Sequence, residues 1–522
     1  MRQRTRLVIN ALASTTARVI ALAIRFAIVP FAISIMGRGH YGLWVVVGQI
    51  FAYTRILDMG LRSAVSREVA LRLGRGEPEK IDRYVNTAAA FYSVVGLLIC
   101  ALTVVLAVYY PHWFEVDPQY HWAVRGMVLC SGLTLACAIA QNSYGAVAAG
   151  LQRYDIISGS QIVADVIRAI LVFALLGHVG IGWGLILMAV ATGGGQTVGA
   201  ILRTLAGLRL CKFVRFRPWQ VDRSLLGGLI AFGVNSVLFM MSLAVGSQLA
   251  QILIGACMST AQATDFSVAA ILMVAVHTIV VTFGMSARVV ASRYDGESNF
   301  RMLRHLLLRS TRYCSLLTMA GVLVLVLFTE ALLRLWMGDN YSGAEGTSAL
   351  ESIARTCRVL AIGYGLFWLS LPSFNVVNGM GRHRFPAILA AGASAISMLL
   401  VIILASTTGA TIDLVAWGVV LPIIPVCGVV LPLYCCRQVH QPVGRYVWEG
   451  FAIPALGCLP AGVAAYLFNY YHSAESWWVL GWQLGSFGLM VLVCAWFFVA
   501  AAADRSQMLG SLSAFLRRFR HV

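Results

Sequence analysis

Apolar runs of about 20 residues recur along almost the whole of this 522-residue chain. A helix needs roughly 20 predominantly apolar residues to cross the hydrocarbon core of a bilayer, so these runs are typical of membrane-spanning helices. Hydrophobic residues make up 59% of the chain and charged residues only 11%, which excludes one or two ordinary soluble domains. The sequence therefore predicts an all-α polytopic membrane protein.

About fourteen candidate spans can be placed, with ends defined to within a few residues. The first six lie near residues 7–36, 42–61, 85–109, 121–148, 156–177 and 181–202. The other eight lie near residues 225–255, 263–287, 311–335, 355–378, 386–407, 411–435, 448–469 and 478–502. Twelve spans and fourteen spans are both compatible with this pattern.

Basic residues concentrate in every second loop between the spans. By this assignment 30 of the 39 Lys and Arg side chains lie on one side of the membrane. Because Lys and Arg beside a span resist translocation, that side is expected to be cytoplasmic. An even number of spans with both termini in the cytoplasm follows. The net charge of +18 is therefore explained by membrane topology, and no nucleic-acid partner is expected.

Two pairs of helix ends indicate an internal duplication. One helix end, Gly60-Leu61-Arg62, has a counterpart 224 positions later that begins at Gly284. Another helix end, Gly150-Leu151-Gln152-Arg153, has a counterpart 229 positions later, Gly379-Met380-Gly381-Arg382. The nearly constant offset predicts two six-helix lobes around a central cavity. The expected parts are an N-terminal lobe at 1–214, a C-terminal lobe at 215–440, two additional spans at 441–503 and a basic cytoplasmic tail at 504–522.

Two arginines interrupt the first span. A cation at the centre of a spanning helix costs roughly 2.5 to 3.5 kcal/mol on insertion scales, so it needs an explanation. Arg18 and Arg25 are seven residues apart, which places them within about 20° of one helix face and about 10 Å apart along the axis. The first span contains no carboxylate. We therefore expect both side chains to face water and to bind an anion such as phosphate.

Four more charged groups bear on this expectation. Arg55 in the second span would add a third cation to the patch, unless it pairs with Asp58 three residues later. Asp165 in the fifth span is the obvious carboxylate to neutralise an arginine of the first span. However, Arg168 is its own i+3 neighbour, so these two residues form either an ion-coupling site or a structural pair.

Other polar groups in the spans have both functional and structural interpretations. His277 has a side chain suited to proton coupling, but a hydrogen-bonded core histidine is the commoner use. Glu330 and Arg334 have the i, i+4 spacing of a surface salt bridge. Amides of the second lobe would suit sugar hydroxyls or would hold helices together. They are Asn235, Gln248, Gln251, Asn375 and Asn378.

No catalytic constellation is recognisable in the sequence. The twelve cysteines lie almost all inside apolar runs and show no zinc-ligand spacing. The outward loops are short, the longest running from about 336 to 352, which leaves little room for an outer catalytic domain. We therefore expect neither an enzyme nor a cofactor or metal site.

Three short motifs resemble polysaccharide flippases of the Wzx type, which export O-antigen units. These motifs are Gly37-Arg38-Gly39-His40-Tyr41-Gly42-Leu43-Trp44, Leu57-Asp58-Met59-Gly60-Leu61 and Gly150-Leu151-Gln152-Arg153. Such flippases belong to the multidrug/oligosaccharidyl-lipid/polysaccharide (MOP) exporter superfamily, which also includes the lipid II flippases of the MurJ type and the MATE exporters. The resemblance implies two lobes that alternate between inward-open and outward-open states. It also implies that Arg18, Arg25 and Arg55 hold a lipid diphosphate, and that the two additional spans form a groove for the lipid tail.

The resemblance implies translocation of undecaprenyl-pyrophosphate-linked oligosaccharide across the bacterial inner membrane, from the cytoplasmic to the periplasmic leaflet. The purpose would be synthesis of a surface polysaccharide such as lipopolysaccharide. Expected partners are the lipid-linked oligosaccharide, the phospholipid bilayer, and the polysaccharide polymerase and ligase machinery. A lipid II flippase for peptidoglycan synthesis is the main alternative, and a membrane enzyme acting on lipid-linked sugars is a further one.

Overall fold

Helices are the only regular secondary structure in the computed structural model, over the residues that it describes. These are residues 2–506 apart from 212, 216, 218–220, 223, 228–247, 285, 383, 473 and 501–504. In addition, side chains are not described at 2–9, 11, 54–61, 63, 74, 78, 140, 283, 284, 286 and 289. Twelve helices within this part of the chain are long and apolar enough to cross a membrane. The predicted all-α polytopic class is confirmed.

The first two predicted spans form one long element. Helix α1 runs from Arg2 to Gly74 and bends at Gly37, where the backbone has φ 76° and ψ 163°. A positive φ is accessible to glycine because it has no Cβ atom, so Gly37 makes the turn between the two spans. Most of the seventh predicted span lies outside the described residues. Its described part includes the apolar helix Gln248–Cys257.

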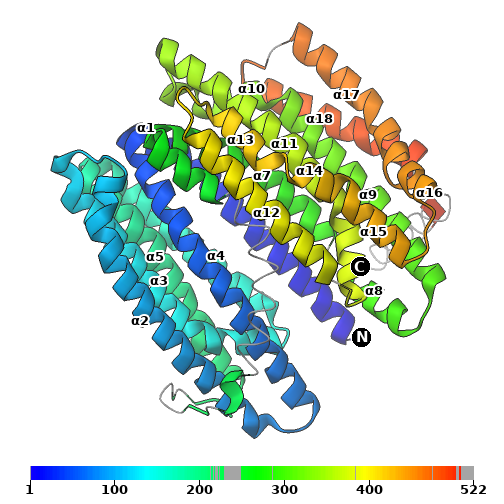
Figure 1. Cartoon of the computed structure of the whole chain (residues 1–522), viewed down its shortest axis with the longest axis horizontal. Helices are drawn as coiled ribbons and strands as arrows, with labels where there is room; N and C mark the ends of the chain where they lie inside the picture. Colours follow the sequence, from blue (N-terminus) through cyan, green and yellow to red (C-terminus); the bar gives the residue numbers. More distant parts are fainter. Residues whose placement is uncertain are drawn as a thin grey trace, which may run out of the picture. The chain divides into compact units, whose positions relative to one another are not determined.

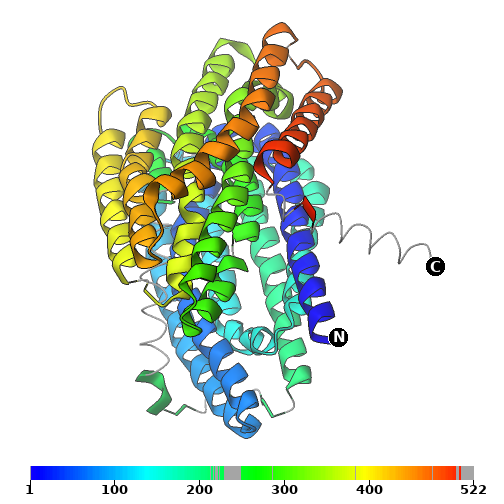
Figure 2. The same cartoon turned by 90° about the vertical axis from the view of Figure 1, so that its right-hand side faces the viewer.

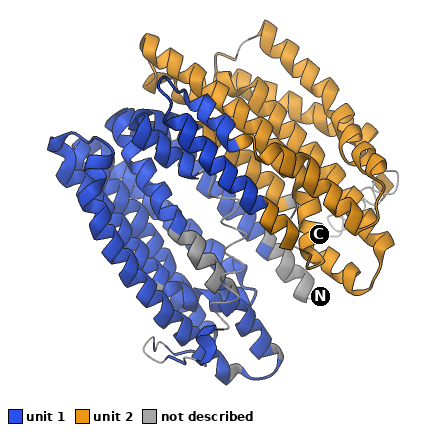
Figure 3. Cartoon of the chain, in the orientation of Figure 1, with its two compact units in different colours: residues 1–268, 390–419 blue, residues 269–389, 420–522 orange. Residues whose placement is uncertain are grey.

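The chain divides into two compact units (Figure 3). Unit 1 comprises Met1–Val268 and Ala390–Val419, and unit 2 comprises Ala269–Leu389 and Val420–Val522. The lobe boundary expected near residue 214 stays a prediction.

Unit 1 is built around helices that pack through small residues. α3 lies between α2 and α5, and α4 packs on α5 (Figure 1). A Cβ atom at Gly207 of α5 would lie 2.5 Å from the Tyr144 carbonyl oxygen, so glycine is needed for this approach. Close helix contact through small residues is typical of membrane proteins. The helices are α2 (Ile81–Trp113), α3 (His121–Gly150), α4 (Tyr154–Leu175), α5 (Ile181–Leu210), α12 (Arg384–Ala405) and α13 (Ile412–Val420), the last two of which extend slightly beyond the unit.

Unit 2 has α9 at its centre, in contact with α11 and α17, while α17 and α18 lie side by side (Figure 2). Arg312 of α9 donates from Nη2 to Glu449 Oε2 at 2.6 Å, which ties α9 to the start of the α17 span. The helices are α7 (Thr260–Gly284, which begins in unit 1), α8 (Ser286–Gly296), α9 (Phe300–Leu327), α10 (Thr329–Met337), α11 (Gly343–Gly379), α14 (Ile423–Pro425), α15 (Leu431–Gln438), α16 (Val443–Val447), α17 (Ile453–Tyr471) and α18 (Trp477–Cys494).

Aromatic side chains surround the connection between α17 and α18. Tyr470, Tyr471, Trp478 and Trp482 are all at least 70% exposed. Tyr and Trp gather at the boundary between lipid and water because their rings are apolar and their polar atoms can reach water. This connection is therefore placed at a membrane surface.

A polar network at the start of α2 holds the segment that follows α5. Asn86 is fully buried and donates from Nδ2 to the Arg215 carbonyl at 3.0 Å and to Asp82 Oδ1 at 2.9 Å. Its Oδ1 accepts from the Tyr144 hydroxyl at 2.8 Å and from the Arg217 amide at 2.9 Å. One side chain thus joins α2, α3 and the segment after α5.

We expect Asn86→Ala to destabilise the protein by about 2–4 kcal/mol, because several buried donors and acceptors lose their partner together. The measurement is thermal unfolding of the purified protein in detergent. Asn469→Ala is the matched control, since the Asn469 side chain makes one hydrogen bond, to the Leu327 carbonyl at 3.0 Å. Equal melting temperatures for the two variants would contradict this role for Asn86.

Candidate functional site

The arginine stripe of α1 is open at one end and packed at the other. Arg18, Arg25, Ala32 and Met36 all lie on the helical part of α1 before Gly37, within about 40° of one face. Arg18 and Arg25 are exposed, whereas Ala32 is 0% and Met36 is 1% exposed. A face directed wholly at lipid would be exposed along its whole length. The stripe therefore passes from an open N-terminal part into the protein interior.

Helix α4 runs parallel to this part of α1. Near its start, Ser14 and Ser158 hydroxyls are 3.3 Å apart, and further along the rings of Phe31 and Phe173 have centroids 5.0 Å apart. Arg25 lies between these two levels. Residue numbers rise in the same direction along both helices, so the two helices are parallel. Helix α4 therefore lies beside the part of α1 that carries the arginines.

The predicted Asp165–Arg168 pair is present on α4. Arg168 Nη2 lies 3.2 Å from Asp165 Oδ1, and the Gln161 amide donates to Asp165 Oδ2 at 3.1 Å. Arg25 lies within electrostatic range of Arg168 and of Tyr41. In the described part of the chain Arg25 itself forms no ion pair. Asp165 is thus engaged by Arg168, and no ion pair joins it to Arg25.

Some of the other predicted site residues lie outside the described part of the chain. The side chains of Arg55 and Asp58, and all of Asn235, lie outside the described residues. Gln248 and Gln251 are in unit 1, and the Oε1 atoms of both are buried with no hydrogen-bond partner among the described residues. Asn375 is buried and Asn378 is half-buried, both on α11 of unit 2. A sugar-binding wall made of these amides stays a prediction.

His277 is hydrogen-bonded within unit 2. The indole Nε1 of the fully buried Trp368 donates to His277 Nδ1 at 2.9 Å, which joins α7 to α11. An acceptor role for Nδ1 leaves the proton of a neutral imidazole on Nε2.

The expected salt bridge between Glu330 and Arg334 is not formed. Glu330 Oε1 instead lies 2.9 Å from Arg358 Nη2 of α11. The correction has a physical reason, because a contact between neighbouring helices competes with the i, i+4 partner on the same helix.

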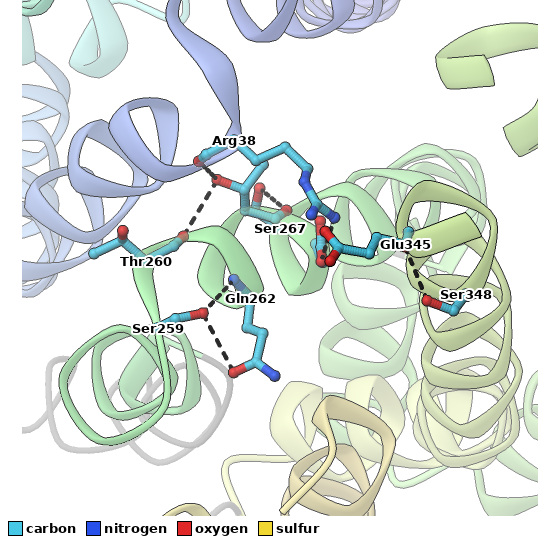
Figure 4. Close-up of polar contacts among 9 residues, drawn as sticks. Arg38, Ser259, Thr260, Gln262, Ser267, Glu345 and Ser348 are labelled. Carbon is cyan, nitrogen blue, oxygen red and sulfur yellow. Dashed lines mark hydrogen bonds and ion pairs between the residues drawn. The ribbon is translucent and has the colours of Figure 1, made fainter. Parts of the chain in front are cut away.

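A second polar site joins α1 to the start of α7 within unit 1. Arg38 Nη1 lies 3.4 Å from Asp265 Oδ2, and the Thr264 hydroxyl donates to the Arg38 carbonyl at 2.7 Å. Asp265 is 7% exposed as a side chain. Figure 4 shows Arg38 beside the first turns of α7, where the Ser259 hydroxyl accepts from the backbone N–H of Gln262 at 3.1 Å. Such a side-chain acceptor stabilises the start of a helix.

Gly42 permits this approach of α1 to α7. A Cβ atom at Gly42 would lie 1.8 Å from the Thr260 carbonyl oxygen, far inside any contact distance. A Cβ at Gly39 would meet only the Thr260 hydroxyl, at 3.7 Å. The glycine-rich stretch that begins at Gly37 marks this site in the sequence, but it does not reveal which residues contact Arg38.

The MatE family model matches residues 236–407 of the chain. No curated protein sequence matches the chain at a significant level. The match covers about a third of the chain and includes α7 to α12.

Solved structures share the fold over most of the chain. The lipid II flippase MurJ in an inward closed conformation has a TM-score of 0.71 and 13% identity, covering 94% of this chain and 98% of that one. An inward-facing multidrug resistance MATE family transporter of the MOP superfamily has a TM-score of 0.67 and 14% identity, covering 81% and 98%. A MOP superfamily transporter from Pyrococcus furiosus has a TM-score of 0.61 and 14% identity, covering 83% and 95%.

The chain therefore shares its fold with these structures, two of which are transporters of the MOP superfamily. The proteins matched are transporters and flippases. With twelve candidate spans, they also support a multi-pass membrane location for this chain.

Proposed function

We propose that this protein flips an undecaprenyl-pyrophosphate-linked oligosaccharide from the cytoplasmic to the periplasmic leaflet of a bacterial inner membrane. The observation that carries the proposal is the stripe of Arg18 and Arg25, exposed inside a membrane span on a face that becomes buried further along α1. A drug cation would be repelled by such a stripe, whereas an anionic headgroup is attracted. The fold shared with MurJ is consistent with a lipid-linked cargo.

The charges of the site are opposite in sign to those of a diphosphate. Arg18, Arg25 and Arg168 with Asp165 carry a formal net charge of two positive units, and a diphosphate between a lipid and a sugar carries two negative ones. A charge pair at about 4 Å with an effective dielectric constant near 20 attracts by about 4 kcal/mol before desolvation. The planar guanidinium donates two parallel hydrogen bonds to phosphate and stays charged when partly desolvated.

Transport in this proposal needs binding and a conformational change but no covalent step. The headgroup leaves the cytoplasmic leaflet while the prenyl tail remains in lipid. A ligand shifts an equilibrium only through different affinities for its two states, so the arginines are expected to hold the diphosphate best in an occluded state. Arg55 would complete the cationic patch. The oligosaccharide would contact amides of the second half, namely Asn235, Gln248, Asn375 and Asn378.

A lipid II flippase is the second candidate, because MurJ is among the structures that share the fold over nearly the whole chain. Complementation separates the two functions. A surface-polysaccharide flippase restores glycan export in a strain that lacks its own flippase, in concert with the polymerase and ligase. A lipid II flippase restores growth after depletion of MurJ. Reporter fusions at both ends of the chain test whether the termini are cytoplasmic.

Reconstitution tests the proposed function directly. Purified protein is placed in vesicles with a fluorescent polyprenyl-diphosphate oligosaccharide, and an impermeant quencher reports movement between the leaflets. We expect protein-dependent movement of this lipid and none of a neutral glycolipid with the same tail. Equal movement of both lipids would indicate a non-specific scramblase. New glycosidic products in the vesicles would indicate an enzyme instead.

A further inference from the structure

The ion pair beside the arginine stripe is more deeply buried than the stripe itself. The side chains of Asp165 and Arg168 are 6% and 18% exposed, whereas Arg18 and Arg25 are exposed. Burying two charges costs desolvation free energy that their mutual attraction only partly offsets. The pair therefore contributes little to the stability of the fold. Its position beside Arg25 suggests a role in binding instead.

The contacts of Arg168 use little of its hydrogen-bonding capacity. It touches Asp165 through Nη2 alone, at 3.2 Å, rather than through the two parallel bonds that arginine and carboxylate can form. Its Nε atom is buried and has no hydrogen-bond partner among the described residues. Asp165 is held independently by Gln161. Arg168 can therefore exchange acceptors while Asp165 keeps one partner.

Arg25 adds to the tendency of Arg168 to take a new acceptor. The two guanidinium groups lie within electrostatic range and repel each other. An anion placed between them would be attracted by both, whereas Asp165 forms an ion pair with Arg168 and none with Arg25. Gly195 of α5 fixes the backbone here, since a Cβ atom at Gly195 would lie 2.4 Å from the Ala164 carbonyl oxygen. The exchange therefore concerns side chains on a firmly packed helix.

We propose that Asp165 is an internal counter-ion that occupies Arg168 until the second phosphate of the cargo replaces it, so that the site selects a diphosphate over a monophosphate. The inference rests on the proposed function. A monophosphate satisfies the exposed arginines of α1 but has no second group for Arg168, so it leaves the ion pair in place. A diphosphate engages both, and Asp165 stays bonded to Gln161.

Binding of two lipids tests this role. Detergent-purified protein is titrated with undecaprenyl diphosphate and with undecaprenyl monophosphate, and bound lipid is measured by native mass spectrometry. For Arg168→Gln we expect diphosphate affinity to fall about tenfold or more, with little change for monophosphate. For Asp165→Asn we expect both affinities to rise, monophosphate more, because Arg168 is then available to either lipid. Both variants thus lose selectivity while their diphosphate affinities move in opposite directions.

Controls separate this role from a structural one. Arg168→Lys keeps the charge and is expected to retain part of the selectivity. Asp155→Asn removes the carboxylate of the Arg153–Asp155 pair at the start of α4 and is expected to leave both affinities unchanged. Two results would show that Asp165 is no counter-ion for the cargo. One is that Asp165→Asn and Arg168→Gln lower the affinities for both lipids equally. The other is that Asp165→Asn raises neither affinity. If Arg25→Ala leaves diphosphate binding unchanged, the proposed function fails instead.

Discussion

Vesicles containing the Arg25→Ala variant are expected to flip the fluorescent polyprenyl-diphosphate oligosaccharide at least about tenfold more slowly than wild type. Arg25 is exposed, forms no ion pair in the described part of the chain, and lies within electrostatic range of Arg168. A hydrogen bond to a charged group is worth about 1.5–3 kcal/mol, which corresponds to roughly 10- to 100-fold in affinity. The quencher assay at subsaturating lipid gives the rate.

Two further variants serve as comparisons for Arg25→Ala in the flipping assay. Arg25→Lys keeps the charge but loses the planar fork, so we expect partial activity. Arg293→Ala removes an exposed arginine of α8 whose partner is Glu297, and it should flip lipid at the wild-type rate. If Arg25→Ala has the melting temperature of wild type and also its rate, the first helix does not hold the cargo.

Helical periodicity predicts that the two arginines share one face of the helix, and the cost of burying a cation predicts that they are exposed. The seven-residue spacing of Arg18 and Arg25 places them on one face of any regular helix. Ala32 continues that face after another seven residues and is nevertheless fully buried. Exposure depends on which helices pack against each part of α1, and this information is spread over distant segments of the chain. The point along α1 at which this face becomes buried could therefore not be predicted from the sequence.

Contacts between neighbours in sequence were predicted better than contacts between helices. The Asp165–Arg168 pair was anticipated because i, i+3 side chains lie together on any helix. Glu330 was assigned to Arg334 by the same rule, but it pairs with Arg358, 28 positions later. Asn86 gave no recognisable signal, although its side chain joins three segments. Local rules fail where a tertiary partner offers the better contact.

The contact between α1 and α7 depends on one missing Cβ atom, which makes Gly42→Ala the sharpest test of its role. We expect this substitution to force the helices apart, because the Thr260 carbonyl belongs to the backbone and cannot rotate away. Overpacking of this kind costs about 1–3 kcal/mol or more. If the contact closes one side of the transporter, the population with that side open rises roughly 5- to 150-fold.

Thiol labelling measures this shift. Thr264 is fully buried in the contact, so a cysteine introduced there reports opening through its reaction with an impermeant maleimide. The exposed Cys137 and Cys257 are first replaced by serine. Labelling should accelerate in Gly42→Ala, and lipid flipping should slow, because alternating access requires both sides to close in turn. Arg38→Gln should act in the same direction, since it removes the ion pair with Asp265 at 3.4 Å.

Gly39→Ala is the matched control, because it adds the same methyl group three residues away, at an ordinary 3.7 Å from the Thr260 hydroxyl. In this variant, the introduced cysteine should react with maleimide at the wild-type rate, and the lipid should be flipped at the wild-type rate. Slow labelling in both glycine variants would mean that α7 accommodates the methyl group without opening, and the contact would then be a permanent part of unit 1. Fast labelling in both would point to general loosening rather than to a gate. Only acceleration confined to Gly42→Ala assigns the gating role to the close approach of α1 and α7.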